Sequence, residues 1–151
     1  MIGMAILQPV IALAAWTMVM WVWLYATRIP AIGKANVDLD ELVHDPATSL
    51  DDVLPPHVQW KAHNYNHLHE APTVFYAVAI VLAIVGEGDG LNAQLAWAYV
   101  GLRVVHSIWQ AAINKVSVRA SLFLLYSLVL IVLAVRAVMA TLFAAPVAMV
   151  S

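Results

Sequence analysis

Four long apolar stretches dominate this sequence and restrict what the chain can fold into. They run from about Met4 to Ala26, Val58 to Val85, Leu91 to Ile113 and Val118 to Ala144. A helix needs about 20 apolar residues to cross the hydrocarbon layer of a bilayer, so each stretch is long enough to span it. The second has a polar first half. We predict an all-α integral membrane protein, a single domain over residues 1–151 that forms a four-transmembrane-helix bundle.

The composition excludes several other classes of protein. Hydrophobic residues make up 64% of the chain, charged residues make up 11%, and cysteine is absent. Soluble domains are roughly 45–50% apolar and about 25% charged, which excludes a soluble globular domain, a disordered chain and a disulfide-stapled secreted domain. The net charge is −2 with only seven Lys and Arg, which excludes electrostatic binding of nucleic acid. Membrane lipid is the expected surroundings of the helices.

The positions of Lys and Arg predict the orientation, because cytoplasmic connections carry an excess of both. The first connection contains Arg28 and Lys34, and the third contains Lys115 and Arg119. The second turn, residues 86–90, contains neither residue type. We therefore expect the first and third connections in the cytoplasm and both termini on the other side.

The first connection, residues 28–57, is acidic and rich in turn-forming residues. It contains six Asp or Glu residues, together with Pro46, Pro55 and Pro56 in its second half. We expect a solvated cytoplasmic loop, with a short amphipathic piece around Leu39–Val43 that lies on the membrane surface.

The second apolar stretch begins with a polar run from Lys61 to Glu70. At 3.6 residues per turn one helix face carries four of its side chains, His63, Asn66, His67 and Glu70. Lys61 points elsewhere, towards water or lipid headgroups. Pro72 removes a backbone hydrogen bond near Leu68, so we expect a kink there.

The third apolar stretch carries a second polar stripe, formed by Arg103, His106, Gln110 and Asn114. Ionisable groups in membrane helices are costly and usually face the bundle interior. Arg103 lies near the middle of its span and needs a carboxylate partner, and Glu70 is the only acid embedded in the second helix. We predict that Glu70 and Arg103 pair, directly or through water.

The polar groups at the cytoplasmic end allow more than one interpretation. Lys61, His63, Lys115 and Arg119 can converge there as a site for a small anion, while an apolar co-substrate enters from the lipid. Alternatively, these cations only anchor the helix ends. His63, His67 and Glu70 also have spacings that suit metal ligation from one helix face, although we expect no metal, since no second motif completes such a site.

Two stretches resemble a known family. One runs from Lys61 to Tyr76 and contains Glu-x-Pro-x-x-Phe-Tyr, and the other is Arg103-Val-Val-His-Ser, followed by Asn114 and Arg119. Together they resemble the family of membrane-associated proteins in eicosanoid and glutathione metabolism (MAPEG), and the chain looks like its bacterial members. The resemblance implies a homotrimer of four-helix subunits in the bacterial inner membrane. It also implies that glutathione binds between subunits, open to the cytoplasm.

The same resemblance assigns roles to individual residues. Arg119 matches the arginine at the start of the fourth helix that stabilises the glutathione thiolate, and Glu70 and Arg103 match family residues of the second and third helices. The pocket is expected to be lined by Lys61, His63, Asn66, His67, Glu70, Arg103, His106 and Gln110. Glutathione-using members have arginine, asparagine and tyrosine where this chain has His63, His67 and Gln110.

Two functions follow from these observations. The first is a glutathione transferase or peroxidase that acts on a lipophilic electrophile, with Arg119 as the catalytic residue. The second is a non-catalytic trimer that binds a lipid, a quinone or a partner membrane protein, in which the polar stripes hold the helices in register.

Overall fold

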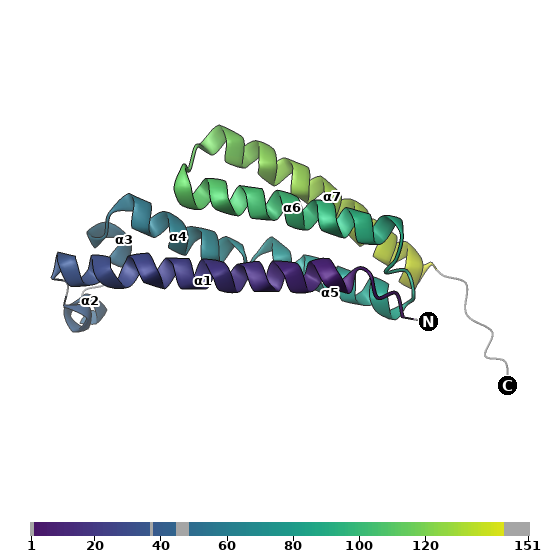
Figure 1. The fold of residues 1–151 in the computed structure, drawn as a ribbon, viewed down its shortest axis with the longest axis horizontal. Helices are drawn as coiled ribbons and strands as arrows, with labels where there is room; N and C mark the ends of the chain where they lie inside the picture. The colour runs from purple at the N-terminus through teal and green to yellow at the C-terminus, as the bar shows by residue number, and fades with distance from the viewer. Residues whose placement is uncertain (1, 37, 45–48, 144–151) are drawn as a thin grey trace.

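The chain is all-helical over the part that its structure, a computed structural model, describes: residues 2–36, 38–44 and 49–143 (Figure 1). The helices are α1 (Leu7–Ala35), α2 (Leu39–His44), α3 (Leu50–Val53), α4 (Pro56–His67), α5 (Ala71–Ile84), α6 (Leu91–Ala112) and α7 (Val116–Leu142). The expected all-α fold is therefore confirmed.

Three helical segments are long and apolar enough to cross a membrane. They are α1, α4 together with α5 (Pro56–Ile84), and α7. The helix α6 has 22 residues and runs beside them, but buried polar side chains such as Arg103 and Gln110 interrupt its apolar sequence. The predicted count of four transmembrane helices therefore holds only if α6 also crosses the membrane.

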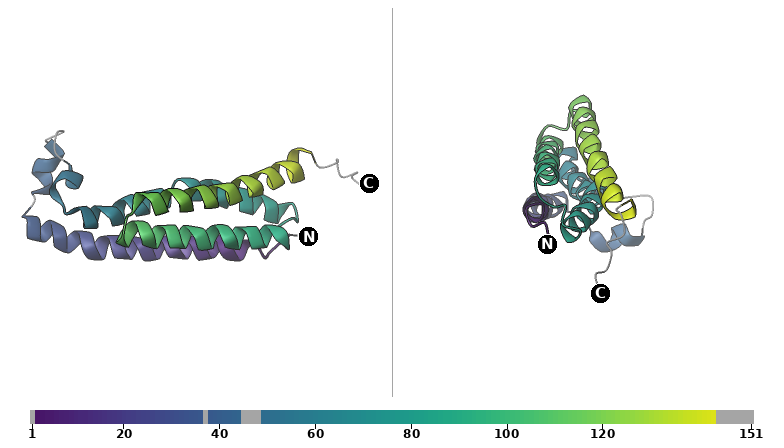
Figure 2. Two further views of the ribbon diagram at one scale, coloured as in Figure 1. Left: turned by 90° about the horizontal axis from the view of Figure 1, so that it is seen from above. Right: turned by 90° about the vertical axis from the view of Figure 1, so that its right-hand side faces the viewer.

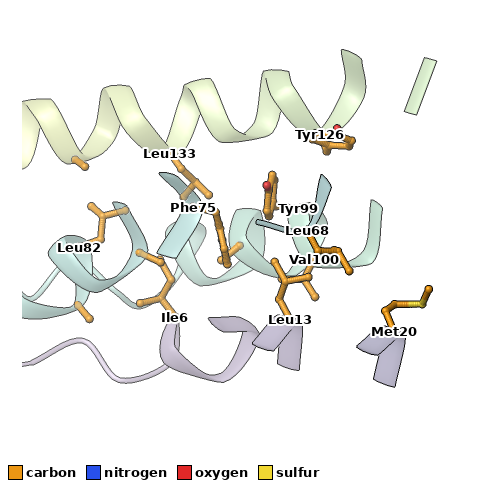
Figure 3. Close-up of a cluster of buried hydrophobic side chains, with 14 of the residues drawn as sticks. Ile6, Leu13, Met20, Leu68, Phe75, Leu82, Tyr99, Val100, Tyr126 and Leu133 are labelled. Carbon is orange, nitrogen blue, oxygen red and sulfur yellow. The ribbon is translucent and has the colours of Figure 1, made fainter. Parts of the chain in front are cut away.

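The long helices pack side by side along one axis, as the two turned views in Figure 2 show. The helix α6 contacts α7, α1 and α4, and α5 contacts α7 and α1. The core between them contains Ile6, Leu13, Phe75 and Leu133, all fully buried (Figure 3). The outer faces of α1 and α7 expose large apolar side chains instead, as expected for helices that contact lipid.

The kink predicted at Pro72 is confirmed as a break between α4 and α5. The helix α4 ends at His67, and Pro72 occupies the first turn of α5, where its missing N–H costs nothing. The break leaves main-chain carbonyls near His67 without partners inside the helix.

The N-terminal segment is tied to the turn between α5 and α6. The Gly3 N–H donates to the Ala83 carbonyl at 2.9 Å, and the Ile6 N–H donates to the Gly88 carbonyl at 2.9 Å. These two segments meet at one end of the bundle (Figure 1). The side of the membrane on which this end lies stays a prediction.

The first connection contains more helix than expected. Instead of a solvated loop from residue 28, α1 continues through Pro30 to Ala35, where Asn36 ends it with a left-handed φ of 49°. The short helix α2 covers the predicted amphipathic piece. In α3, Ser49 and Asp52 form a reciprocal capping box.

Candidate functional site

A cavity of about 180 Å³ lies where the end of α4 meets α6 and the first turns of α7. It is lined by His67, His106, Val116, Arg119, Ala120, Phe123 and Tyr126. Three residues expected in the site, His67, His106 and Arg119, are thus brought together from three helices. Val116, Ala120 and Phe123 add apolar surface beside Arg119 on the α7 side.

Arg119 is the cation of this cavity. Its Nη1 donates to Oδ1 of Asn114 at 2.6 Å, while its buried Nε has no hydrogen-bond partner among the described residues. Asn114 adopts a φ of 58° in the turn before α7, a conformation that asparagine tolerates well. Arg119 lies in the first turn of α7, where the helix dipole is also positive, so this end of the cavity favours an anion.

His106 and Tyr126 form the inner wall of the cavity. Both are buried, and their rings meet edge to face with centroids 5.5 Å apart. Tyr126 also faces Tyr99, with ring centroids 5.8 Å apart, so aromatic packing holds α6 against α7 behind the cavity (Figure 3).

Arg103 lies behind this wall and does not pair directly with Glu70. Its guanidinium, 2% exposed, donates to the main-chain carbonyl of His67 and lies 4.6 Å from the centre of the Tyr126 ring. The carboxylate of Glu70 accepts instead from Nδ1 of His67 at 2.7 Å. The direct form of the predicted pairing is therefore wrong, because the helix break frees a carbonyl for Arg103 and leaves Glu70 exposed at the start of α5. Pairing through a water molecule stays a prediction.

The histidine stripe of α4 separates into two exposed pairs. His63 Nε2 lies 3.2 Å from Oδ2 of Asp51 in α3, whereas His67 pairs with Glu70. Asn66 is exposed beside them. Within the described ranges, no group of three or more His, Asp or Glu side chains is placed to hold a metal ion.

Lys61 also differs from the prediction, because it is buried rather than directed towards water. It is 8% exposed, its Nζ donates to the His57 carbonyl at 2.7 Å, and it lies 5.5 Å from the centre of the Trp23 ring. The ammonium group thus lies on the side of α4 that faces α1, where the cation–π contact stabilises its charge. Of the four cationic residues expected to converge, only Arg119 lines the cavity.

The polar stripe of α6 does face the interior, as predicted. Arg103, His106 and Gln110 are each no more than 5% exposed. The Oε1 of Gln110 is buried without a hydrogen-bond partner in the described part of the chain, so it is an acceptor still available to a water molecule or a ligand.

One network was not predicted from the sequence. The hydroxyl of Ser107 accepts from Nδ2 of Asn64 at 2.7 Å and from Nε1 of Trp16 at 3.0 Å, which joins α6, α4 and α1. Both Asn64 and Ser107 are 1% exposed. The available signal was helical spacing for Ser107, which lies four residues after Arg103 and three before Gln110, and position within the polar run of α4 for Asn64.

The long apolar helices and their apolar outer faces together define an integral membrane protein with a helical bundle. The chain belongs to the MAPEG family, whose sequence profile matches residues 6–139. Comparison with curated proteins and with solved structures found no match.

Proposed function

We propose that this protein is a membrane-bound, glutathione-dependent transferase or peroxidase that acts on a lipophilic electrophile. The observation that carries the proposal is the Arg119 cavity. A buried guanidinium N–H without a partner lies there beside two histidines, at the positive end of a long helix. Membership of the MAPEG family supports a function of this general class.

The chemistry assigned to Arg119 is stabilisation of a thiolate. A free thiol has a pKa near 8.5, and a neighbouring cation lowers it, so that more of the nucleophilic thiolate is present at neutral pH. The thiol proton passes to water, and the thiolate sulfur then forms a bond to a carbon of an electron-poor double bond. The π bond breaks as the C–S bond forms, and the resulting carbanion takes a proton from water. Two contacts support this role: Oδ1 of Asn114 accepts from one side of the guanidinium, and the buried Nε has no partner among the described residues.

The size of the cavity supports a trimer. Small-molecule sites usually occupy about 300–1,000 Å³, whereas this cavity measures about 180 Å³ within one chain. We propose that it receives the thiol end of glutathione and that a neighbouring copy completes the site. Glu70 and His63 are exposed on α4 and its end, where they can contact the polar remainder of the ligand.

Ligand binding tests the proposal directly. The purified protein is titrated with glutathione and with S-methyl glutathione while its melting temperature is followed. A saturable rise is expected with both ligands, because a ligand that binds only the folded state stabilises it. No shift at millimolar ligand would refute the glutathione site.

Substitution of Arg119 then separates catalysis from binding. Arg119→Ala is expected to lower turnover of a model electrophile at least about tenfold, since loss of the cation raises the thiol pKa by a unit or more. Arg28→Ala removes one positive charge from α1, outside the cavity, and serves as the matched control. Full turnover in Arg119→Ala would remove Arg119 from the mechanism.

A non-catalytic trimer is the second candidate. The observation in its favour is that Asn64, Ser107 and Arg103 join helices to one another rather than point into the cavity. Under this interpretation the polar stripes hold the bundle together, and the protein binds a lipid, a quinone or another membrane protein. Native mass spectrometry that finds such a bound partner, together with no shift by glutathione, would support it.

A further inference from the structure

A second, larger space lies at the other side of the molecule from α7, between the last turns of α1 and the segment that leads from α3 into α4. This groove has a volume of about 580 Å³ and is lined by Ala26, Thr27, Pro30, Ala31, Lys34, Ala35, Val53, Pro55, His57 and Val58. It shares no lining residue with the Arg119 cavity. Any ligand bound here therefore occupies a separate site.

The groove lies at the boundary between membrane and water. The 29 residues of α1 extend over roughly 40 Å at about 1.5 Å per residue, longer than the hydrocarbon layer of about 30 Å. Trp21 and Tyr25, whose ring centroids lie 4.9 Å apart, belong to an aromatic cluster typical of the interface. The α1 residues that line the groove all follow this cluster in the sequence, so an acyl chain can enter from the lipid while a polar head stays in water.

The lining combines an apolar floor with basic groups at its edge. Pro30, Ala31 and Val58 supply apolar surface, whereas Lys34 and His57 are exposed. The acidic side chains of α3 have other partners, so they are not free to neutralise the positive charge at this edge. Asp51 pairs with His63, and Asp52 accepts two hydrogen bonds from Ser49.

We propose that this groove binds a free long-chain fatty acid. Its carboxylate contacts Lys34 and His57, and its acyl chain lies along Pro30, Ala31 and Val58. The volume is in the range of sites for small ligands and is too small to enclose both acyl chains of a phospholipid. The basic edge distinguishes a fatty acid from an uncharged lipid of the same length.

Photo-crosslinking tests the proposal on the full-length protein in phosphatidylcholine nanodiscs. The probe is a palmitate analogue with a diazirine on its chain, and the labelled peptides are mapped by mass spectrometry. We expect labels on residues 26–35 and 53–58, competed by palmitate but not by methyl palmitate. Lys34→Gln is expected to lower this labelling about two- to fivefold, since one partly exposed charge contact is lost.

A matched pair of bulky variants separates the groove from general membrane partitioning. Ala31→Trp fills the groove and is expected to abolish labelling there. Gly33→Trp places the same bulk on the same helix, where a Cβ atom meets nothing within 4 Å, and should leave labelling unchanged. Arg119→Ala should also leave it unchanged, so that failure of this site and failure of the glutathione site remain distinguishable.

Three results would overturn the proposal. The first is equal competition by methyl palmitate, which shows that the carboxylate is not recognised. The second is labelling spread over the apolar face of α7 and insensitive to Ala31→Trp, which shows partitioning into the bilayer only. The third is a phospholipid that native mass spectrometry finds bound to the extracted protein and that Ala31→Trp removes.

Discussion

The guanidinium of Arg103 donates a hydrogen bond to the main-chain carbonyl of His67, the last residue of α4. A cation buried in the middle of a membrane bundle usually needs an acid. Here the end of a broken helix provides an acceptor, the negative end of the α4 dipole lies at the same point, and Tyr126 offers its ring face. The break before Pro72 thus supplies the acceptor that the buried arginine uses.

Replacing Arg103 should destabilise the bundle. Arg103→Met keeps much of the side-chain volume but leaves the His67 carbonyl without its donor, and a buried unsatisfied group costs about 1–3 kcal/mol. We expect a loss of that size in the free energy of unfolding, measured by denaturant titration in mixed micelles. Glu70→Gln should cost less, because Glu70 is exposed. A larger loss for Glu70→Gln than for Arg103→Met would contradict this assignment.

Ser107 should be more important for stability than an ordinary membrane serine. Ser107→Ala removes one acceptor from two donors, Asn64 and Trp16, so we expect a loss of about 1–3 kcal/mol in the free energy of unfolding. The matched control is Ser121→Ala, since Ser121 is exposed and bonds only locally to the Ser117 carbonyl. Equal stability of the two variants would show that the network contributes nothing.

Close contact between Gly3 and Gly88 should make position 88 intolerant of a side chain. A Cβ atom at Gly88 would lie 2.2 Å from the Gly3 carbonyl oxygen, so Gly88→Ala must displace the N-terminal segment. We expect a cost of about 1–3 kcal/mol, typical of overpacking. In Gly101→Ala the new Cβ meets nothing within 4 Å, and a helical alanine should be neutral or stabilising by up to about 1 kcal/mol. Thermal denaturation of both variants is the measurement, and equal melting temperatures would disprove the contact.

The capping box of α3 should respond to pH. The Ser49 hydroxyl and main-chain N–H both donate to the Asp52 carboxylate, which lowers the pKa of Asp52 below its usual value. Because the folded pKa is below the unfolded one, the stabilisation is complete above the unfolded pKa, near 3.9 for Asp, and is lost as the pH falls through the folded value.

Hydrogen exchange of the amides of α3, corrected for the intrinsic effect of pH, can measure this response. We expect protection to fall at acidic pH in the wild type. In Asp52→Asn protection should be low throughout, without this pH step. An unchanged step in the variant would show that Asp52 is not the group responsible.

Much of the fold could be predicted from the sequence, because apolar length and helical periodicity are local properties. The stretch lengths indicate membrane helices, the spacing of Arg103, His106 and Gln110 indicates their common buried face, and Pro72 indicates the break. The motifs around Glu70 and Arg103 also indicate the family. Each of these inferences needs only residues within a few helical turns of one another.

The contacts between polar groups could be seen only in the tertiary structure. Periodicity places His67 and Glu70 on one face. It cannot show that the helix break leaves Glu70 exposed, or that the freed main-chain carbonyl of His67 accepts a hydrogen bond from Arg103. It also cannot show that Lys61 packs on Trp23 of another helix, or that Arg119 enters a cavity with His106. Partner choice depends on how whole helices cross and on which backbone groups a break releases, and these are set by packing between segments far apart in the chain.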